Sequence, residues 1–242
     1  MSFLRAYFIT APAVVLATIG YGFVSLIISL FESSGRRQIG VARAWARCLL
    51  WVSGVKTRVE GLEKIAPDGS YVFVSNHLSY MDTPVVLANI PVQFRFLAKS
   101  GLFQIPFLGT HLARAGHIPV PREDARAAVK TMTTAAQVIR DRSISLLIFP
   151  EGGRSETGEL AAFKAGAAYI AIRANVPLVP IALKGTREIL PYGSGQVRGG
   201  PVTMRIGDPI RTDQLALRDR DRVTAELRNQ IVSMLDEQPI HA

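Results

Sequence analysis

Cysteine is almost absent from this chain, and charged residues are scarce. Cys48 is the single cysteine among 242 residues, so an intramolecular disulfide and a metal site built on several thiolates are excluded. Charged residues make up 19% of the chain and hydrophobic residues 48%, which is too apolar for a disordered protein and unusual for a soluble enzyme. The sequence therefore indicates a folded domain with a sizeable core and some contact with lipid.

Motifs for covalent catalysis and for metal binding are missing as well. No G-x-S-x-G sequence indicates a nucleophilic serine, and no H-x-x-x-H or H-E-x-x-H pair indicates a metal site. His111 and His117 are accordingly expected to be hydrogen-bonded polar residues in or beside a strand, and no bound metal is expected. A catalytic base in this chain would have to act on a hydroxyl group of a substrate or on water.

Acidic residues are rare near the N-terminus. Residues 1–58 hold seven basic residues and Glu32 as their one acid, so they supply +6 of the net charge of +9. These cations adjoin a long apolar run. An anionic membrane surface is therefore a simpler partner than a nucleic acid, which is not expected.

The apolar run extends from Ala6 to Phe31 and contains 26 residues without a charge. At a rise of about 1.5 Å per residue, such a helix reaches the roughly 30 Å of a bilayer's hydrocarbon core, and it is longer than the apolar part of a signal peptide. Pro12 and the Gly20-Tyr21-Gly22 step could divide it, so a spanning helix and a hairpin that enters one leaflet and returns both stay open.

The segment from Arg36 to Val52 combines arginines with Trp45 and Trp51 at helical spacing. Arginine pairs with anionic headgroups and indole rings prefer the membrane interface, so an interfacial helix is expected. An amphipathic helix packed on the domain is the alternative. The arginines that follow the apolar run favour a cytoplasmic placement of everything downstream. Residues 1–55 are expected to anchor the chain to the membrane.

From residue 56 onward, short β-rich runs alternate with helical stretches, which predicts an α/β fold with a mixed sheet flanked by helices. The expected strands are 57–59, 71–75, 94–98, 117–120, 145–149, 178–183 and 202–206. The expected helices are 83–89, 123–140, 163–174 and 223–236. The run at 145–149 is apolar on both faces and is expected to be a central strand. In such folds the catalytic and binding residues lie on the loops at strand ends.

The loop after the strand 71–75 holds His77 and Asp82. Imidazole has an ordinary pKa of about 6.5, so it accepts a proton near neutral pH, and a nearby carboxylate fixes its tautomer. Residues five apart do not face each other on a straight helix, so this pair requires the loop to fold back before a helix begins at Asp82-Thr83-Pro84. The alternative is that Asp82 only caps that helix and His77 is a polar loop residue.

The loop after the strand 145–149 reads Glu151-Gly152-Gly153-Arg154. Glycines let the backbone approach a ligand closely, and a guanidinium binds phosphate through two N–H groups, so this loop suits a phosphorylated substrate. A plain surface turn is the alternative. Lys99, which follows the strand 94–98, is a second candidate phosphate contact, with a solvated lysine as its alternative.

With these blocks assembled, the chain resembles the glycerolipid acyltransferase family, most closely the bacterial 1-acylglycerol-3-phosphate acyltransferases. The matching segments are Asn76 to Asp82 (NHLSYMD, for N-H-x-x-x-x-D), Lys99 to Gly109 (KSGLFQIPFLG), Phe149 to Ser155 (FPEGGRS, for F-P-E-G-T-R-S) and Val179 to Ala182 (VPIA). Gly153 departs from the threonine that is usual in the family. The resemblance covers roughly residues 56–210, and residues 56–242 are expected to form the acyltransferase domain.

The resemblance implies a reaction and a set of site residues. His77, oriented by Asp82, would remove the proton from the free sn-2 hydroxyl of 1-acylglycerol-3-phosphate as it attacks an acyl thioester, giving phosphatidate without an acyl-enzyme. The residues expected to bind substrate are Asn76, Lys99, Glu151, Gly152, Gly153 and Arg154.

The implied donor is acyl-CoA or acyl-acyl-carrier protein, no cofactor is expected, and the implied location is the inner membrane with the catalytic domain on its cytoplasmic side. A lyso-ornithine lipid, another lysophospholipid or glycerol 3-phosphate is an alternative acceptor. A membrane-surface binding protein without activity is the remote alternative.

Overall fold

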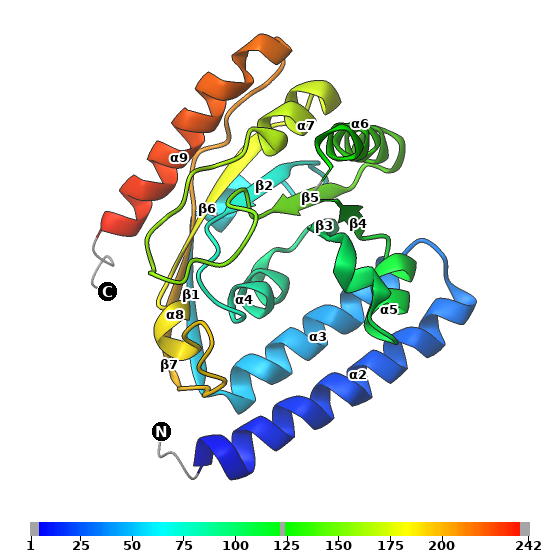
Figure 1. The fold of residues 1–242 in the computed structure, drawn as a ribbon, viewed down its shortest axis with the longest axis vertical. Coiled ribbons are helices and arrows are strands. Elements are labelled where there is room, and N and C mark those ends of the chain that lie inside the picture. The colour runs from blue at the N-terminus through cyan, green and yellow to red at the C-terminus, as the bar shows by residue number, and fades with distance from the viewer. Residues whose placement is uncertain (1–4, 122–123, 238–242) are drawn as a thin grey trace.

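The computed structural model describes residues 5–121 and 124–237, which form one mixed sheet with helices on both faces (Figure 1). The strand order is β1-β7-β6-β2-β5-β3-β4, and neighbouring strands are parallel except for the antiparallel pair β6 and β7. The strands are β1 (Val55–Glu60), β2 (Val72–Ser75), β3 (Phe94–Lys99), β4 (Ile118–Val120), β5 (Ser145–Ile148), β6 (Leu178–Lys184) and β7 (Gly200–Ile206). The predicted α/β fold with a mixed sheet is confirmed.

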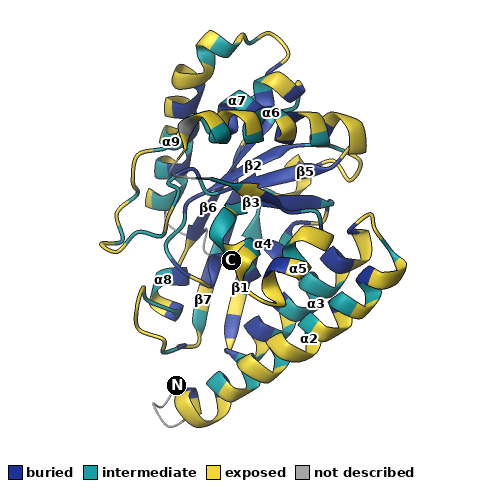
Figure 2. Cartoon of the chain, turned by 45° about the vertical axis from the view of Figure 1, so that its right-hand side comes forward, coloured by how far each residue is buried: buried dark blue, intermediate teal, exposed yellow. Residues whose placement is uncertain are grey.

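Two apolar layers cover the sheet, and they explain why its central strands are buried on both faces (Figure 2). Phe73 of β2 points into the layer shared with α3 (Arg36–Val52) and α4 (Asp82–Asn89). Its neighbours Val72 and Val74 point into the layer formed with α6 (Ala125–Arg142), α7 (Gly166–Ala174) and α9 (Arg220–Asp236). This alternation follows from the two-residue period of a strand.

The predicted helices differ from the observed ones mainly at their starts. The helix expected from 163 begins at Gly166, because the backbone N–H of Lys164 donates to Pro150 O and holds that stretch in the preceding loop. The start expected at Glu123 lies outside the described residues; Asp124 caps α6 by accepting from two backbone N–H groups. Short elements were not predicted from the sequence: η3 (Ser100–Gln104), α5 (Leu108–Arg114) and α8 (Thr186–Ile189).

The N-terminal apolar run forms one continuous helical segment, η1 (Ala6–Thr10) followed by α2 (Ala11–Phe31). Pro12 lies in the first turn of α2, where a missing N–H costs little, and the glycines at 20 and 22 do not interrupt the helix. A tight turn then reverses the chain into α3, so α2 and α3 form a helical hairpin (Figure 1). Gly35 makes this turn with φ +74°, and a Cβ there would lie 2.5 Å from the carbonyl oxygen of Ala115.

One side of the α2 helix is exposed along its length (Figure 2), and the large side chains on that side are apolar, whereas polar residues face the protein. Ser25 and Ser29 are buried, whereas Leu16, Ile19 and Phe23 are each more than 60% exposed. This is the reverse of a surface helix on a water-soluble domain. The segment Ala6–Phe31 is long and apolar enough to cross a membrane, and 11% of its most apolar window is buried.

Hydrogen bonds fix this polar side to the domain. Ser25 Oγ lies 2.8 Å from His111 Nδ1 of α5, and Arg114 donates to the backbone carbonyl of Ser29 at 3.0 Å. Trp45 of α3 donates from Nε1 to Thr18 Oγ1 at 3.1 Å. The position of α2 against the domain is therefore set by directional polar contacts.

The α3 helix packs on the domain, which was the alternative to the expected interfacial helix. Ala46 and Leu50 are buried in the layer that includes β2 and α4. Arg43 is one of the arginines of this segment, which were expected to pair with lipid headgroups, but it donates to the backbone carbonyls of Ile90 and Val92. Trp51 remains 80% exposed. The division of the chain at residues 55 and 56 stays a prediction.

Candidate active site

The two loops singled out from the sequence lie side by side at one edge of the sheet. They follow β2 and β5, which are parallel neighbours with Val72 opposite Leu146 and Val74 opposite Ile148. Parallel strands in register end at the same edge, so residues 76–82 and 149–155 must meet there. A direct bond joins them: the Ser155 N–H donates to the carbonyl oxygen of His77 at 3.1 Å.

His77 and Asp82 form a hydrogen-bonded pair. Nδ1 of His77 lies 2.8 Å from Oδ2 of Asp82, and the same oxygen accepts the backbone N–H groups of Leu78 and Ser79, both at 2.8 Å. The two backbone bonds fold the loop back onto the start of α4, which is the condition that the spacing of five residues required. Asp82 is completely buried, so its position is tightly constrained.

This pairing leaves one ring nitrogen of His77 available as a base. A carboxylate oxygen only accepts hydrogen bonds, so in the neutral imidazole this pairing selects the tautomer with the proton on Nδ1 and the lone pair on Nε2. Throughout the described part of the chain, no hydrogen bond reaches Nε2. The imidazole stacks on Phe149 with ring centroids 4.0 Å apart, and the His77 side chain is 17% exposed. A positioned, solvent-accessible imidazole with a carboxylate behind it is suited to general-base catalysis.

Asn76 lies next to the pair but faces away from solvent. Its amide donates to the carbonyl oxygen of Leu183 at 2.9 Å and accepts the N–H of the same residue at 2.8 Å. Asn76 is completely buried, and these two bonds attach the loop to β6. Its predicted contact with a substrate stays a prediction.

Glu151 ties the second loop to the first. Its Oε1 accepts the backbone N–H of His77 at 2.6 Å, and its Oε2 accepts that of Ala161 at 3.1 Å. Burial raises the pKa of this carboxyl above its ordinary value, although both hydrogen bonds act in the opposite direction. The Glu151 side chain thus connects the two loops through hydrogen bonds to their backbones.

The two glycines of the second loop have different constraints. Gly152 has φ +79°, and a Cβ there would lie 3.1 Å from Nζ of Lys164. A Cβ at Gly153 would meet nothing within 4 Å, so there is room for the threonine that is usual at this position. Lys164, which was not among the predicted site residues, adds a cation beside Gly152 of this loop. Its signal in the sequence is the stretch Phe163-Lys164-Ala165-Gly166, which resembles the family.

Arg154 is a half-buried cation that has no polar partner among the residues the structure describes. Its guanidinium carbon lies 3.3 Å from the centroid of the Tyr80 ring and 5.7 Å from that of Tyr192. In residues 5–121 and 124–237, it makes neither a hydrogen bond nor an ion pair. Its N–H groups are therefore available to an anion. Lys99 lies at the end of β3, on the same edge of the sheet, and is exposed.

His111 and His117 have hydrogen-bond partners, as predicted, but only His117 lies beside a strand, since His111 is part of α5. His117 Nδ1 accepts the backbone N–H of Phe96 at 3.0 Å, and His111 bonds Ser25. Burial lowers the pKa of His117 to about 3, with smaller contributions from His111 and Arg95. Among the residues that the structure describes, no group of three or more His, Cys, Asp or Glu side chains could hold a metal ion.

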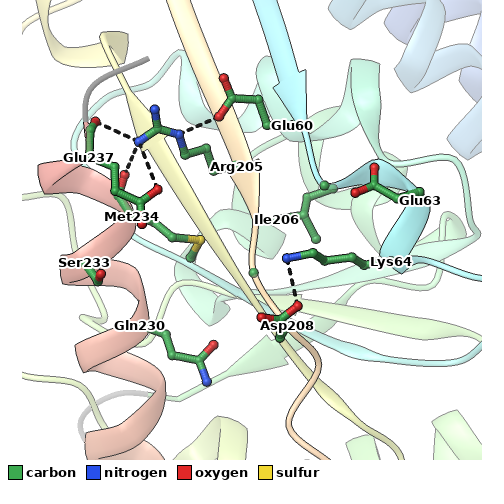
Figure 3. Close-up of a pocket in the computed structure, with 12 residues that line it drawn as sticks. Glu60, Glu63, Lys64, Arg205, Ile206, Asp208, Gln230, Ser233, Met234 and Glu237 are labelled. Carbon is green, nitrogen blue, oxygen red and sulfur yellow. Dashed lines mark hydrogen bonds and ion pairs between the residues drawn. The ribbon is translucent and has the colours of Figure 1, made fainter. Parts of the chain in front are cut away.

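A separate cavity of about 360 Å³ lies at the opposite edge of the sheet (Figure 3). The strands β1 and β7 end there, because β7 runs antiparallel to β6. In Figure 3, Arg205 points toward Glu60 and Glu237, and Lys64 pairs with Asp208 at 2.8 Å. None of the site residues predicted from the sequence lines this cavity.

Comparison with known proteins gives a consistent assignment. An acyltransferase family model matches residues 56–184. A chloroplastic 1-acyl-sn-glycerol-3-phosphate acyltransferase of Arabidopsis thaliana is 34% identical over 226 residues, covering 92% of this chain and 60% of the relative. The 1-acyl-sn-glycerol-3-phosphate acyltransferase of Saccharomyces cerevisiae is 30% identical over 237 residues, covering 96% of this chain and 78% of the relative.

The same fold is present in a solved structure. The crystal structure of the 1-acyl-sn-glycerophosphate acyltransferase PlsC from Thermotoga maritima matches with a TM-score of 0.79 and 22% identity, covering 99% of this chain and all of that one. This chain spans about three fifths of the length of the plant relatives that it matches. From the family model and the relatives together, the chain belongs to the acyltransferase family.

Proposed function

We propose that this protein transfers an acyl chain from a thioester donor to the free sn-2 hydroxyl of 1-acylglycerol-3-phosphate and so makes phosphatidate. The observation that carries the proposal is the His77–Asp82 pair at 2.8 Å, next to Arg154, whose N–H groups have no partner within residues 5–121 and 124–237. The names of the relatives from Arabidopsis and Saccharomyces support the same acceptor. Acyl-CoA and acyl-acyl-carrier protein are both suitable donors.

In the proposed reaction, Nε2 of His77 takes the proton of the acceptor hydroxyl as its oxygen attacks the thioester carbonyl. Asp82 stabilises the imidazolium that forms. Collapse of the tetrahedral intermediate breaks the carbon–sulfur bond, and the imidazolium returns the proton to the leaving thiolate. The acyl chain passes directly between substrates, so no acyl-enzyme forms.

Phosphate binding is assigned to the cations around this pair. Arg154 offers two parallel N–H groups to a phosphate, and Lys99 and Lys164 add charge. Gly152 and Gly153 leave the backbone of the same loop accessible to the reacting groups. The acceptor carries one negative headgroup and one hydroxyl, which matches one cationic loop beside one base.

We also infer that the exposed apolar side of α2 lies in the membrane interface, at the inner membrane with the catalytic residues on its cytoplasmic side. The acceptor's acyl chain is costly to extract from a bilayer, at about 0.8 kcal/mol per CH₂ group. An enzyme fixed at the surface avoids that cost. The outward orientation of Leu16, Ile19 and Phe23 supports this placement.

The test is an acyl-transfer assay with purified protein in detergent. Wild type and His77→Ala are incubated with lysophosphatidate and labelled acyl-CoA or acyl-acyl-carrier protein, and the lipids are separated by thin-layer chromatography. Labelled phosphatidate from the wild type, reduced at least about 10²-fold in His77→Ala, is expected. Near-normal turnover by a folded His77→Ala variant would contradict the mechanism, and no phosphatidate with either donor would contradict the acceptor.

A further inference from the structure

Arg154 contacts the rings of two tyrosines, Tyr80 and Tyr192, and the three residues lie on three separate segments of the chain. Tyr80 lies in the loop before α4, Arg154 in the loop after β5, and Tyr192 in the loop after α8. The guanidinium carbon is 3.3 Å from the Tyr80 ring centroid, within the range of a strong cation–π contact, and 5.7 Å from the Tyr192 centroid. Both rings are exposed, Tyr80 by 57% and Tyr192 by 44%.

A hydrogen bond ties the two loops that carry the tyrosines. Ser79 Oγ donates to the backbone carbonyl of Leu190 at 2.9 Å. Tyr80 is the next residue after Ser79, and Tyr192 follows Leu190 by two positions. Ser79 is completely buried, so this bond sets the separation of the two loops.

Contact through the face of a guanidinium leaves its edges free. The five N–H donors of arginine lie in the plane of the group, whereas a stacked ring occupies the space above or below that plane. A long, flexible side chain loses less entropy on binding an anion if its plane is already oriented. Neither tyrosine neutralises the positive charge, in contrast to a carboxylate partner.

We propose that Tyr80 and Tyr192 are positioning residues that orient the Arg154 guanidinium edge-on toward the phosphate of the acceptor. The inference rests on the proposed function and adds two residues to it. Tyr80 is the main contact because its ring is the nearer one. The Arg154 guanidinium would thereby be oriented before the acceptor binds. This orientation would favour a compact phosphate monoester headgroup.

The test compares leucine and phenylalanine at each position. Tyr80→Leu should raise KM for lysophosphatidate about three- to tenfold with little change in kcat, since a cation–π contact contributes to binding in the ground state and the transition state alike. Tyr80→Phe keeps the aromatic face and should stay within about twofold of wild type. Tyr192→Leu should raise KM by about twofold, because its ring is farther from the guanidinium.

A double-mutant cycle tests whether Tyr80 acts through Arg154. In an Arg154→Gln background, Tyr80→Leu should raise KM no further. An equal increase in both backgrounds, a fall in kcat without a change in KM, or equal behaviour of Tyr80→Leu and Tyr80→Phe would overturn the proposal. Thermal unfolding of each variant excludes a general loss of the fold.

A binding measurement keeps this inference separate from the proposed reaction. Glycerol 3-phosphate is titrated into the protein and its binding followed by phosphorus NMR. If wild type makes no phosphatidate, the proposed function fails. Weaker glycerol 3-phosphate binding by Tyr80→Leu than by Tyr80→Phe would still support the proposal that Tyr80 orients Arg154. Equal binding by the two variants would overturn it.

Discussion

The carboxylate of Glu151 accepts the backbone N–H of His77 at 2.6 Å, so the second site loop fixes the residue proposed as the base. Its other oxygen accepts the N–H of Ala161 at 3.1 Å. The side chain therefore acts as an internal brace between two loops. The family resemblance implied a contact with substrate for Glu151, which stays a prediction, and its observed hydrogen bonds indicate a role in positioning His77.

Replacing Glu151 by glutamine should weaken this brace. The amide keeps one acceptor oxygen but turns an N–H₂ group toward a backbone N–H, and an unsatisfied buried donor costs about 1–3 kcal/mol. We expect the free energy of unfolding to fall by about that amount in denaturant titrations, with a fall in turnover of tenfold or so. Glu159→Gln, in the same loop but exposed, is the matched control and should behave as wild type. Unchanged stability and turnover in Glu151→Gln would show that the brace is dispensable.

His117 should make the protein less stable in mild acid. Burial lowers the pKa of its imidazole to about 3, below the ordinary value of 6.5, so the unfolded chain binds a proton that the folded chain does not. The contribution of neutral His117 is fully present above pH 6.5 and is lost as the pH falls toward 3. Between pH 6.5 and 5 we expect His117 to lower the free energy of unfolding by up to about 1.4 kcal/mol per pH unit.

The measurement is urea unfolding of wild type and His117→Asn over this pH range. An asparagine oxygen can accept the Phe96 N–H in place of Nδ1, but it does not titrate. The variant should therefore show a flatter pH dependence. The same slope in both proteins would assign the acid sensitivity to other groups.

The outer side of α2 should carry the membrane affinity. Ile19 and Phe23 are 64% and 65% exposed, and burying each in the interface contributes roughly 1.5–3 kcal/mol. We expect the Ile19→Glu, Phe23→Glu double variant to bind vesicles of phosphatidylglycerol and phosphatidylethanolamine at least about tenfold more weakly in flotation assays. Val129→Glu, at an exposed apolar residue of α6, is the control. An equal effect of the control would show that any added negative charge reduces binding.

The turn between α2 and α3 should tolerate only glycine. At Gly35, φ is +74° and a Cβ would lie 2.5 Å from the Ala115 carbonyl oxygen, so Gly35→Ala should cost about 1–3 kcal/mol of stability. Gly153→Thr restores the residue usual in the family at a position with open space, and should change stability by less than about 0.5 kcal/mol. The measurement is the thermal unfolding temperature of the two variants, which should fall in Gly35→Ala only. Equal unfolding temperatures would contradict the steric argument.

The sequence by itself determined the class of fold and the position of the site loops. The short runs 72–75 and 145–148 form strands that are buried on both faces of the sheet. A strand in that position needs mainly apolar side chains on both faces, and the sequence shows this directly. Both site loops follow predicted strands, which places His77 and Glu151 at strand ends. That these two strands are parallel neighbours, so that their loops meet, was decided by the tertiary structure. The apolar run at 6–31 likewise predicted helical structure, but that Pro12 and the two glycines do not divide it is known only from the structure.

Tertiary structure decided which atoms meet. Whether Asp82 faced His77 depended on backbone bonds from Leu78 and Ser79 that spacing alone does not specify. The contact of Arg154 with Tyr192 joins residues on separate loops, and no local pattern encodes it.

The orientation of α2 was decided in the same way. Composition made the helix apolar, but its hydrogen bonds with His111 and Arg114 determined which side faces the protein. Apolar burial is proportional to area and has no direction, whereas hydrogen bonds require particular partners at particular angles, and only the folded chain supplies those.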